Sequence, residues 1–179
     1  SRARNLLKSA KIIKKKFNNK IPDSYDELIK LPGIGDYTAK AILGIAFNKS
    51  VMPLDANIER ILVRLHAINK PISKIKTRLK DLGDKFRSDK FSSNLIQSFM
   101  DYGSEICVPR NPKCEICGIK KLCQSFEEKI QLQIPTKLKK KNIKPIKYTR
   151  AYVLVNEKNE ILVRNRPEKG MLASMLEVP

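Results

Sequence analysis

The sequence predicts a mainly α-helical domain, followed by a linker and by the start of a domain that contains β-strands. Apolar residues recur at helical spacing up to about residue 100. All four cysteines then fall within residues 107–123. After them, a lysine-rich stretch precedes two runs of β-forming residues. We therefore expect a helical domain at residues 1–125, a basic linker at residues 126–147 and a third segment at residues 148–179.

Capping signals and apolar spacing place the first three helices. The helix expected over residues 5–17 has one apolar face, formed by Leu6, Ala10, Ile13 and Phe17. Ser24 followed by Glu27 is a capping-box pattern, which predicts the start of a short second helix. Asp36 is expected to cap a third helix that runs to about Phe47.

Three longer helices complete the predicted helical domain. Asp55 precedes a helix whose apolar stripe holds Ile58, Ile61, Leu62 and Leu65. The next helix carries Ile75, Leu79, Leu82 and Phe86. The last one leads to the first cysteine and carries Leu95, Ile96, Phe99 and Met100. The pattern up to this point predicts no β-strand.

The C-terminal part of the chain has a different character. Prolines and lysines mark the linker, whose lysines include Lys137, Lys139, Lys140, Lys141, Lys144 and Lys147. They form either a solvated tether or a contact to phosphates. Residues 151–155 and 161–163 flank a turn-rich stretch and predict a β-hairpin. Since an isolated hairpin is marginally stable, we expect the domain at residues 148–179 to be incomplete.

The charge of the chain points to a polyanionic partner. The 179 residues include 37 Lys and Arg against 18 Asp and Glu, a formal net charge of +19. Nucleic acid is the usual partner of such a chain, although a lysine-rich proteome would give part of the excess. No apolar run is long enough to cross a membrane, and no signal peptide is evident. We expect a monomer in a reducing compartment: the cytoplasm of a bacterium, or the nucleus or an organelle of a eukaryote.

The cysteines form one compact group with the spacing C-x6-C-x2-C-x5-C, namely Cys107, Cys114, Cys117 and Cys123. Structural zinc sites usually contain two C-x2-C pairs, and only one such pair is present here. An asymmetric run of single and paired cysteines favours a [4Fe–4S] cluster, with zinc as the alternative. Two disulfides would require an oxidising compartment.

Two glycines lie in a short connection between predicted helices, in the segment Pro32-Gly33-Ile34-Gly35. Glycine lets a backbone turn tightly and approach a ligand closely. The N–H groups at the start of the following helix can then hold a phosphate without regard to base sequence. An ordinary helical hairpin with a glycine C-cap is the alternative.

Asp55 stands alone as a carboxylate shortly after this connection. An aspartate before a helix is usually an N-cap. Close to a bound phosphodiester, it could instead stabilise the positive charge that develops on a deoxyribose when its base departs. Such a reaction also needs an acid that protonates the base. Asn57 is a candidate hydrogen-bonding partner, with a core or capping role as the alternative.

These motifs, in this order, resemble the helix-hairpin-helix DNA glycosylases that carry an iron–sulfur cluster, and most closely the adenine-specific MutY family. The resembling stretches are residues 1–6, 31–39, 54–61 and 100–103, the last leading into the cysteines. The resemblance implies that the four cysteines bind [4Fe–4S] and that Asp55 is the catalytic carboxylate. It also implies phosphate binding by the glycine hairpin and by the cluster loop near Arg110 and Lys113.

Position 37 separates the branches of this superfamily. Endonuclease III has a lysine there, which attacks the sugar and allows strand cleavage, whereas this chain has Tyr37. The resemblance therefore implies base removal without a lyase step. Residues 148–179 resemble the start of the Nudix-like α+β domain of the MutY family, with Arg166-Pro167 and residues 176–179 as markers. That domain recognises 8-oxoguanine.

The sequence departs from the family pattern in two places. The family usually has D-G-N where this chain has Asp55-Ala56-Asn57, and the added methyl group is sterically mild. The family also contains S-E-x-M-L-Q-Q-T, whose glutamate protonates the departing adenine. No glutamate of this chain lies in such a motif. We therefore expect the chain to begin after that region and to lack the general acid.

The implied function is hydrolysis of the N-glycosidic bond of adenine opposite 8-oxoguanine or guanine in double-stranded DNA, a step of base excision repair. Two alternatives remain open. One is a related mismatch glycosylase that removes thymine. The other is a non-catalytic iron–sulfur module that only binds DNA.

Overall fold

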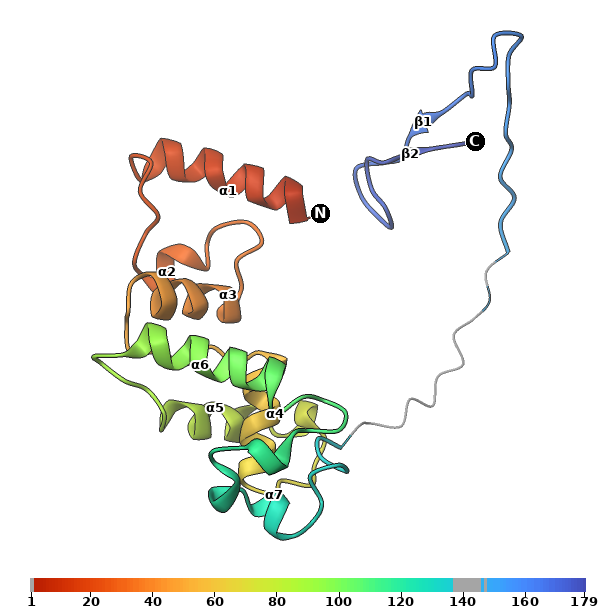
Figure 1. Ribbon diagram of the computed structural model, residues 1–179. Coiled ribbons are helices and arrows are strands. Elements are labelled where there is room, and N and C mark those ends of the chain that lie inside the picture. The colour runs from red at the N-terminus through yellow and green to blue at the C-terminus, as the bar shows by residue number, and fades with distance from the viewer. Residues whose placement is uncertain (1, 137–145, 147) are drawn as a thin grey trace. The chain divides into compact units, whose positions relative to one another are not determined.

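The computed structural model describes residues 2–136, 146 and 148–179. The chain forms two compact units, Arg2–Lys139 and Lys140–Pro179, which are described one at a time. The secondary structure described in the first unit is entirely helical (Figure 1), so the prediction of a mainly helical fold is confirmed. No helix in the described residues is long and apolar enough to span a membrane. The predicted linker lysines at residues 137–145 and 147 lie outside the described residues.

The N-terminal helices share a small core of their own. They are α1 (Arg2–Lys16), α2 (Tyr25–Leu28) and α3 (Asp36–Ala41), and α3 continues into a π-helical turn, η1 (Ile42–Ala46). The buried residues of this core are Leu28, Leu31, Ala39 and Leu43. Burial of each large apolar side chain contributes about 1.5–3 kcal/mol. This core holds together the glycine-containing connection between α2 and α3.

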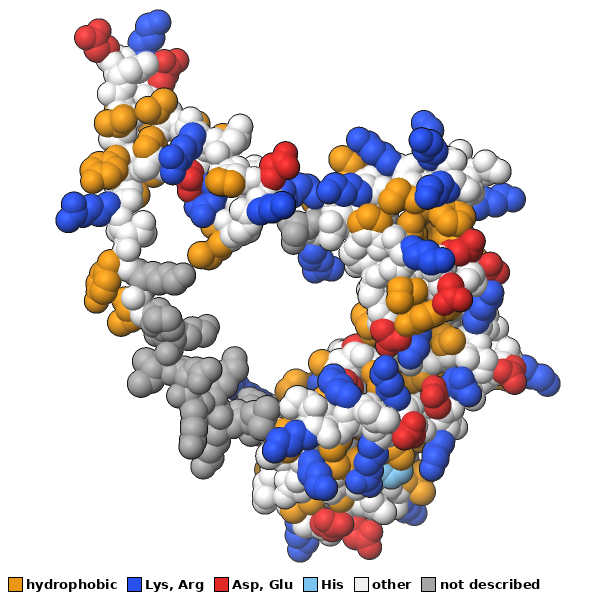
Figure 2. Space-filling model, turned by 180° about the vertical axis from the view of Figure 1, so that it is seen from behind, with side chains coloured by type: hydrophobic (Ala, Val, Ile, Leu, Met, Phe, Trp, Pro, Cys, Tyr) orange, Lys and Arg blue, Asp and Glu red, His pale blue; other side chains and the backbone are white. Residues whose placement is uncertain are grey.

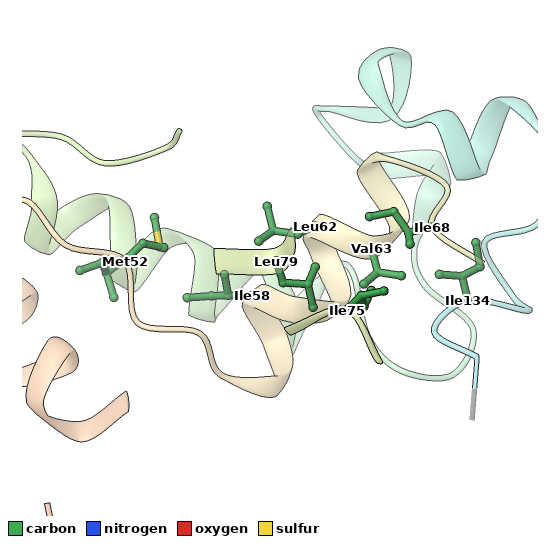
Figure 3. Close-up of a cluster of buried hydrophobic side chains, with 9 residues drawn as sticks. Met52, Ile58, Leu62, Val63, Ile68, Ile75, Leu79 and Ile134 are labelled. Carbon is green, nitrogen blue, oxygen red and sulfur yellow. The ribbon is translucent and has the colours of Figure 1, made fainter. Parts of the chain in front are cut away.

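The larger core surrounds α4 (Ala56–Leu65), which packs against α5 (Lys76–Asp84), α6 (Ser92–Glu105) and α7 (Gln124–Glu127). Its buried members come from several of these elements and from the loops between them (Figure 3). They are Met52, Ile58, Leu62, Val63, Ile68, Ile75, Leu79, Ile96 and Ile134. Residues 58–64 of α4 are all buried, which is the pattern of a helix enclosed by the fold.

The cysteine loop follows α6 and contains little regular structure. It has two short 3₁₀ turns, η3 (Cys114–Ile116) and η4 (Lys120–Leu122), before α7. A third 3₁₀ turn, η2 (Ile72–Lys74), precedes α5. Such short turns bury little apolar surface by themselves. The shape of the loop therefore depends on the contacts that its side chains make inside it.

Of the two predicted caps near the glycine hairpin, Ser24 is correct in position only, and Asp36 is wrong by one residue. Ser24 occupies the N-cap position of α2, but its side chain makes no capping hydrogen bond. Gly35, not Asp36, is the N-cap residue of α3. Asp36 is the first helical residue, and its carboxylate accepts a hydrogen bond from the hydroxyl of Tyr25 at 2.8 Å and pairs with Lys40 at 3.2 Å. The sequence pattern could not show that Tyr25 from the neighbouring helix engages this carboxylate.

The predicted apolar face of α1 is only partly correct. Ile13 and Phe17 pack against the N-terminal core, whereas Leu6 is 73% exposed and Ala10 is also exposed. The side of α1 that contacts the glycine hairpin is polar, because the hydroxyl of Ser9 donates to the carbonyl oxygen of Pro32 at 2.8 Å. Leu6 and Ala10 instead line a hollow of about 490 Å³ beside that hairpin.

The hairpin predicted in the second unit is present as a short pairing. Val155 and Ile161 form an isolated antiparallel bridge, and the amide of Leu162 donates to the carbonyl oxygen of Leu154 at 2.9 Å. The apolar side chains of both arms remain about half exposed or more. This exposure agrees with the expectation that a single hairpin buries too little surface to be stable alone.

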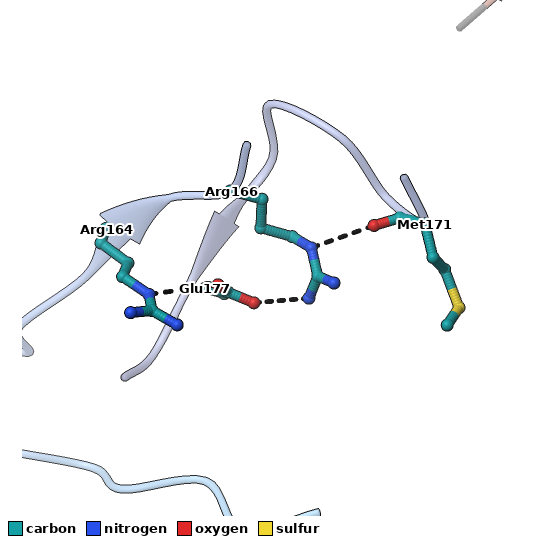
Figure 4. A network of polar contacts seen from close by, with 4 residues as sticks. All are labelled: Arg164, Arg166, Met171 and Glu177. Carbon is teal, nitrogen blue, oxygen red and sulfur yellow. Dashed lines mark hydrogen bonds and ion pairs between the residues drawn. The ribbon is translucent and has the colours of Figure 1, made fainter. Parts of the chain in front are cut away.

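A second pairing in this unit joins β1 (Arg164–Asn165) to β2 (Leu176–Glu177) in antiparallel register. The carboxylate of Glu177 accepts hydrogen bonds from Nε of Arg164 at 3.2 Å and from Nη1 of Arg166 at 2.5 Å (Figure 4). Arg166 is one of the two residues of the predicted Arg166-Pro167 marker. Its side chain is therefore bound to Glu177 within this unit.

Candidate active site and metal centre

Asp55 begins α4 and caps it. Its Oδ1 atom accepts a hydrogen bond from the backbone amide of Ile58 at 2.7 Å, as the capping interpretation predicts. The side chain is partly exposed, and Oδ2 has no hydrogen-bond donor among the described residues. One carboxylate oxygen is thus held in place, while no donor among the described residues holds the other.

Tyr37 on α3 lies near this carboxylate. Burial, and secondly the negative charge of Asp55, raise the pKa of the Tyr37 hydroxyl above its ordinary value. Tyr37 is therefore a neutral phenol at pH 7, with 41% of its surface exposed. The fold brings together two of the predicted catalytic residues, although they lie on different helices.

Asn57 is held between α4 and α6. Its Oδ1 atom accepts a hydrogen bond from Nη2 of Arg60 at 2.8 Å. On the other side, it lies against Gly103, where an added Cβ would be 2.6 Å from Cβ of Asn57. The side chain that was predicted as a hydrogen-bonding partner for the reaction is therefore already fixed within the protein.

The tight contact at Gly103 gives a testable prediction. Gly103→Ala is expected to separate α6 from Asn57 and to lower the free energy of unfolding by about 1–3 kcal/mol, because overpacking forces a backbone shift. Thermal denaturation checks this value. Gly118→Ala is the matched control, since nothing lies within 4 Å of a Cβ added there. Equal stability of the two variants would contradict the packing argument.

Arg60 connects the start of α4 to the cysteine loop, and sequence reasoning missed it. The residue is 5% exposed. Besides Asn57, its guanidinium donates to the carbonyl oxygen of Cys107 at 2.7 Å, of Gly103 at 2.5 Å and of Ala56 at 3.2 Å. The signal in the sequence is an arginine within a stripe of apolar residues, three positions after Asn57.

Arg64 lies one helical turn further along α4 and was also missed. It is 2% exposed. Its guanidinium donates to the carbonyl oxygens of Ile134 at 3.0 Å, Cys107 at 3.3 Å, Val108 at 2.8 Å and Pro109 at 3.2 Å. Nη1 also donates to Sγ of Cys107 at 3.3 Å. A single buried side chain thus binds the beginning of the cysteine loop and the segment after it.

The four predicted cysteine ligands are brought together. None of them forms a disulfide, and all four line one almost entirely apolar cavity of about 30 Å³. The hydroxyl of Tyr102 donates to Sγ of Cys117 at 3.0 Å. Burial, and then the charges of the neighbouring cysteines, raise the pKa of Cys114; burial is also the largest cause of the raised pKa of Cys123. Thiolates in this site therefore need a positively charged core between them.

The four cysteines surround one cavity without converging on a single ion. Within the described residues, no group of three or more Cys, His, Asp or Glu side chains is placed to hold a single metal ion. The four cysteines nevertheless surround the same cavity. A zinc site draws its four sulfurs to about 2.3 Å from one atom, whereas the body of an iron–sulfur cluster separates its ligands. The donor set and its spacing fit a cluster.

The two glycines of the hairpin have different surroundings. Gly33 has a φ of +83°, and a Cβ there would be 2.8 Å from Cβ of Asn5 on α1. Gly35 has an extended backbone and nothing within 4 Å of an added Cβ. Gly33 is thus required by the turn and by the packing of α1, whereas Gly35 leaves the backbone accessible. Ile34 packs against the N-terminal core.

This difference predicts unequal effects of alanine. Gly33→Ala is expected to lower the free energy of unfolding by about 1–3 kcal/mol, since it adds a strained φ to a steric contact. Gly35→Ala is expected to cost less than about 1 kcal/mol, because only an N-cap preference changes. Urea titration of both variants measures the difference. A larger loss for Gly35→Ala would be inconsistent with these surroundings.

Basic side chains do not mark a single interface. Arg110 and Lys113 are both exposed on the cysteine loop, where a ligand could reach them. On the face of the helical unit that Figure 2 shows, however, Lys and Arg side chains are spread widely rather than gathered. Charge alone therefore does not locate a nucleic-acid contact.

The glycine hairpin and the cysteine loop both lie in segments that match known protein families. The helix-hairpin-helix motif family matches residues 16–45, and the iron–sulfur binding domain of endonuclease III matches residues 107–123. The chain is 40% identical over 184 residues to an adenine DNA glycosylase of Buchnera aphidicola subsp. Baizongia pistaciae (strain Bp), an alignment that covers 100% of this chain and 51% of that protein. The chain spans about half the length of the curated relatives that it matches.

Two solved structures share the helical fold. A thermostable thymine-DNA glycosylase has a TM-score of 0.62 at 29% identity, covering 71% of this chain and 59% of the other. An endonuclease III bound non-covalently to DNA has a TM-score of 0.58 at 25% identity, covering 72% and 59%.

Because it matches the iron–sulfur binding domain of endonuclease III, the cysteine loop is the site of a [4Fe–4S] cluster. The chain thus contains the helix-hairpin-helix motif and the iron–sulfur binding domain of endonuclease III, and along its whole length it is similar to adenine DNA glycosylases.

Proposed function

We propose that this protein is a DNA glycosylase that hydrolyses the N-glycosidic bond of adenine opposite 8-oxoguanine or guanine in double-stranded DNA. The observation that carries the proposal is that Tyr37 on α3 lies within electrostatic reach of Asp55 at the start of α4. This arrangement occurs in a chain that is similar to adenine DNA glycosylases over its whole length.

Asp55 is proposed to act on the sugar. When the adenine leaves, positive charge develops on the deoxyribose ring, and a nearby carboxylate lowers the energy of that state. The amide of Ile58 fixes Oδ1 of Asp55, and Oδ2 remains available to face the sugar. Asn57 is proposed to support this position, because Arg60 holds its side chain next to α6.

Tyr37 determines the fate of the sugar after the base is lost. A neutral phenol cannot form a Schiff base with the sugar, which an amine at this position would do. Water is then the nucleophile, and the product is an abasic site in an uncut strand. The departing adenine also needs a proton. The resemblance assigns that role to a glutamate in a motif that has no match in this sequence, so no residue of this chain is assigned to it.

DNA is proposed to bind at two places of the helical unit. The backbone around Gly35 is open enough to approach a phosphate, and Gly33 and Pro32 fix the turn that presents it. Arg110 and Lys113 are exposed on the cluster loop and would contact another stretch of backbone. The cluster itself then has a structural role, since it shapes the loop that carries these side chains. We further propose that residues 148–179 begin a Nudix-like domain that recognises 8-oxoguanine.

A base-release assay tests the proposal. Duplexes with adenine opposite 8-oxoguanine, with adenine opposite thymine and with thymine opposite guanine are incubated with excess protein and then treated with hot alkali. Cleavage at the adenine of the first duplex only is expected, and it is expected to be slow because no residue of this chain is assigned as the general acid. Cleavage at thymine would favour the related mismatch glycosylase, and strand cleavage without alkali would contradict the role given to Tyr37.

A non-catalytic, DNA-binding iron–sulfur module is the second candidate. The observation in its favour is that no glutamate of this chain lies in the general-acid motif. Binding of the first duplex without release of any base would support this candidate. Comparison with Gly35→Ala under the same conditions would show whether the hairpin carries the binding.

A further inference from the structure

Arg64 is a buried cation without a carboxylate partner among the described residues. Its guanidinium is surrounded by four backbone carbonyl oxygens and one cysteine sulfur, and the side chain is 2% exposed. None of the ion pairs in the described residues involves it. Carbonyl dipoles satisfy its hydrogen-bond donors but do not neutralise its charge. An uncompensated buried charge is strongly destabilising.

The residues around Arg64 do not supply the missing negative charge. Arg60 lies close enough on the same helix for the two positive charges to repel each other. Glu59, the buried acidic residue of α4, is engaged by Lys76. The negative charges that act on Arg60 are those of Cys107, which lines the cavity, and of Asp55 at the start of the helix. A source of negative charge must therefore lie on the side of Arg64 that faces the cysteine cavity.

We propose that Arg64 is the buried counter-cation of the iron–sulfur cluster. Four thiolates outweigh the positive charge of the iron–sulfide core, so the ligated cluster is an anion. Arg64 lines the cavity that the four cysteines surround, and its Nη1 donates directly to Sγ of Cys107. The backbone carbonyl oxygen of the same residue lies 3.5 Å from Sγ of Cys123. Arg64 is thus in contact with two of the four ligands.

This pairing couples the cluster to a distant segment of the chain. Nε of Arg64 donates to the carbonyl oxygen of Ile134, a residue that is 2% exposed and belongs to the larger core. The charge of the cluster holds the guanidinium in place, and the guanidinium in turn holds the chain where it leaves the loop. This role of Arg64 does not depend on which base the protein removes.

The reduction potential distinguishes a counter-cation from a merely structural arginine. A positive charge beside the cluster stabilises its more negative, reduced state, and hydrogen bonds to the sulfurs act in the same direction. Tyr102 provides an internal comparison, because its hydroxyl donates to Sγ of Cys117 at 3.0 Å without carrying charge. Removing the charge should therefore shift the potential more than removing this neutral donor.

The experiment compares three variants of the chain by voltammetry and by the rate of iron release to a chelator. Arg64→Gln removes the charge, Arg64→Lys keeps it but loses the fork of donors, and Tyr102→Phe removes the neutral donor. Arg64→Gln is expected to disfavour reduction at least tenfold, a shift of about 59 mV to more negative potential for a one-electron couple. Arg64→Lys is expected to stay within about threefold of the parent, and Tyr102→Phe to shift less than Arg64→Gln.

Each outcome decides the proposal. Faster iron release from Arg64→Gln than from Arg64→Lys would support it, as would cluster assembly in the lysine variant alone. An unchanged potential in Arg64→Gln would overturn the proposal. Equal shifts in Arg64→Gln and Arg64→Lys, or failure of both to assemble a cluster, would also overturn it, because the geometry of the guanidinium rather than its charge would then be what matters.

Discussion

Asp55→Asn is expected to slow adenine release from an adenine:8-oxoguanine duplex by about a thousandfold. The asparagine side chain can accept the same hydrogen bond from the amide of Ile58, and it is as good an N-cap as aspartate. It carries no charge, however, and cannot stabilise a cationic sugar. The rate of adenine release under single-turnover conditions measures this loss of activity. The free energy of unfolding should remain within about 0.5 kcal/mol of the parent.

Asp55→Ala is the control that separates the cap from the charge. It removes both, so it should lose the same activity and in addition about 1 kcal/mol of stability. If Asp55→Asn released adenine at the parental rate, the catalytic role of this carboxylate would be wrong. If Asp55→Asn were as unstable as Asp55→Ala, loss of activity would say nothing about chemistry.

Loss of the cluster is expected to open the chain from Cys107 to Ile134 and to leave the N-terminal helices folded. The loop contains only short turns, held by single backbone hydrogen bonds such as that from Cys117 to Cys114 at 3.2 Å. Without the cluster, its four sulfurs would surround an empty cavity, and Arg64 would become an unpaired buried cation. Binding of a structural metal site contributes folding free energy directly, typically about 10 kcal/mol for zinc peptides.

Hydrogen exchange of a Cys114→Ser variant measures this opening. Amides of residues 107–134 should lose protection, whereas Leu28 and Ala39 belong to a separate core and should keep theirs. Glu115→Gln is the matched control, because it changes an exposed carboxylate in the same loop. Uniform loss of protection over both cores would contradict the local role of the cluster. Full protection in Cys114→Ser would show that the loop does not depend on it.

Several features of the site could be predicted from the sequence because they depend on local spacing. The four cysteines are close in the chain, and a loop of their length has few ways to gather them. Asp55 precedes an apolar helical stripe, so its capping geometry was predictable. Tyr37 was predicted only through the resemblance. Its approach to Asp55 depends on how α3 packs beside α4, which no local pattern contains.

The features that sequence reasoning missed depend on burial. Arg60 and Arg64 look like the solvent-exposed positions of an amphipathic helix, because arginine is seldom fully buried. The structure buries them because backbone carbonyls of the cysteine loop lie around α4 and accept their hydrogen bonds. Similarly, Leu6 was assigned to a buried face, although the residue of α1 that contacts the hairpin is Ser9.

Identification of the released base tests the central proposal most directly. The chain is incubated in oxygen-labelled water with a duplex that contains both an adenine:8-oxoguanine pair and a thymine:guanine pair, and the products are analysed by mass spectrometry. We predict free adenine, an intact strand and one labelled oxygen at the deoxyribose carbon that held the base. Free thymine, a cleaved strand or the absence of any free base would contradict hydrolysis of adenine at the site formed by Asp55 and Tyr37.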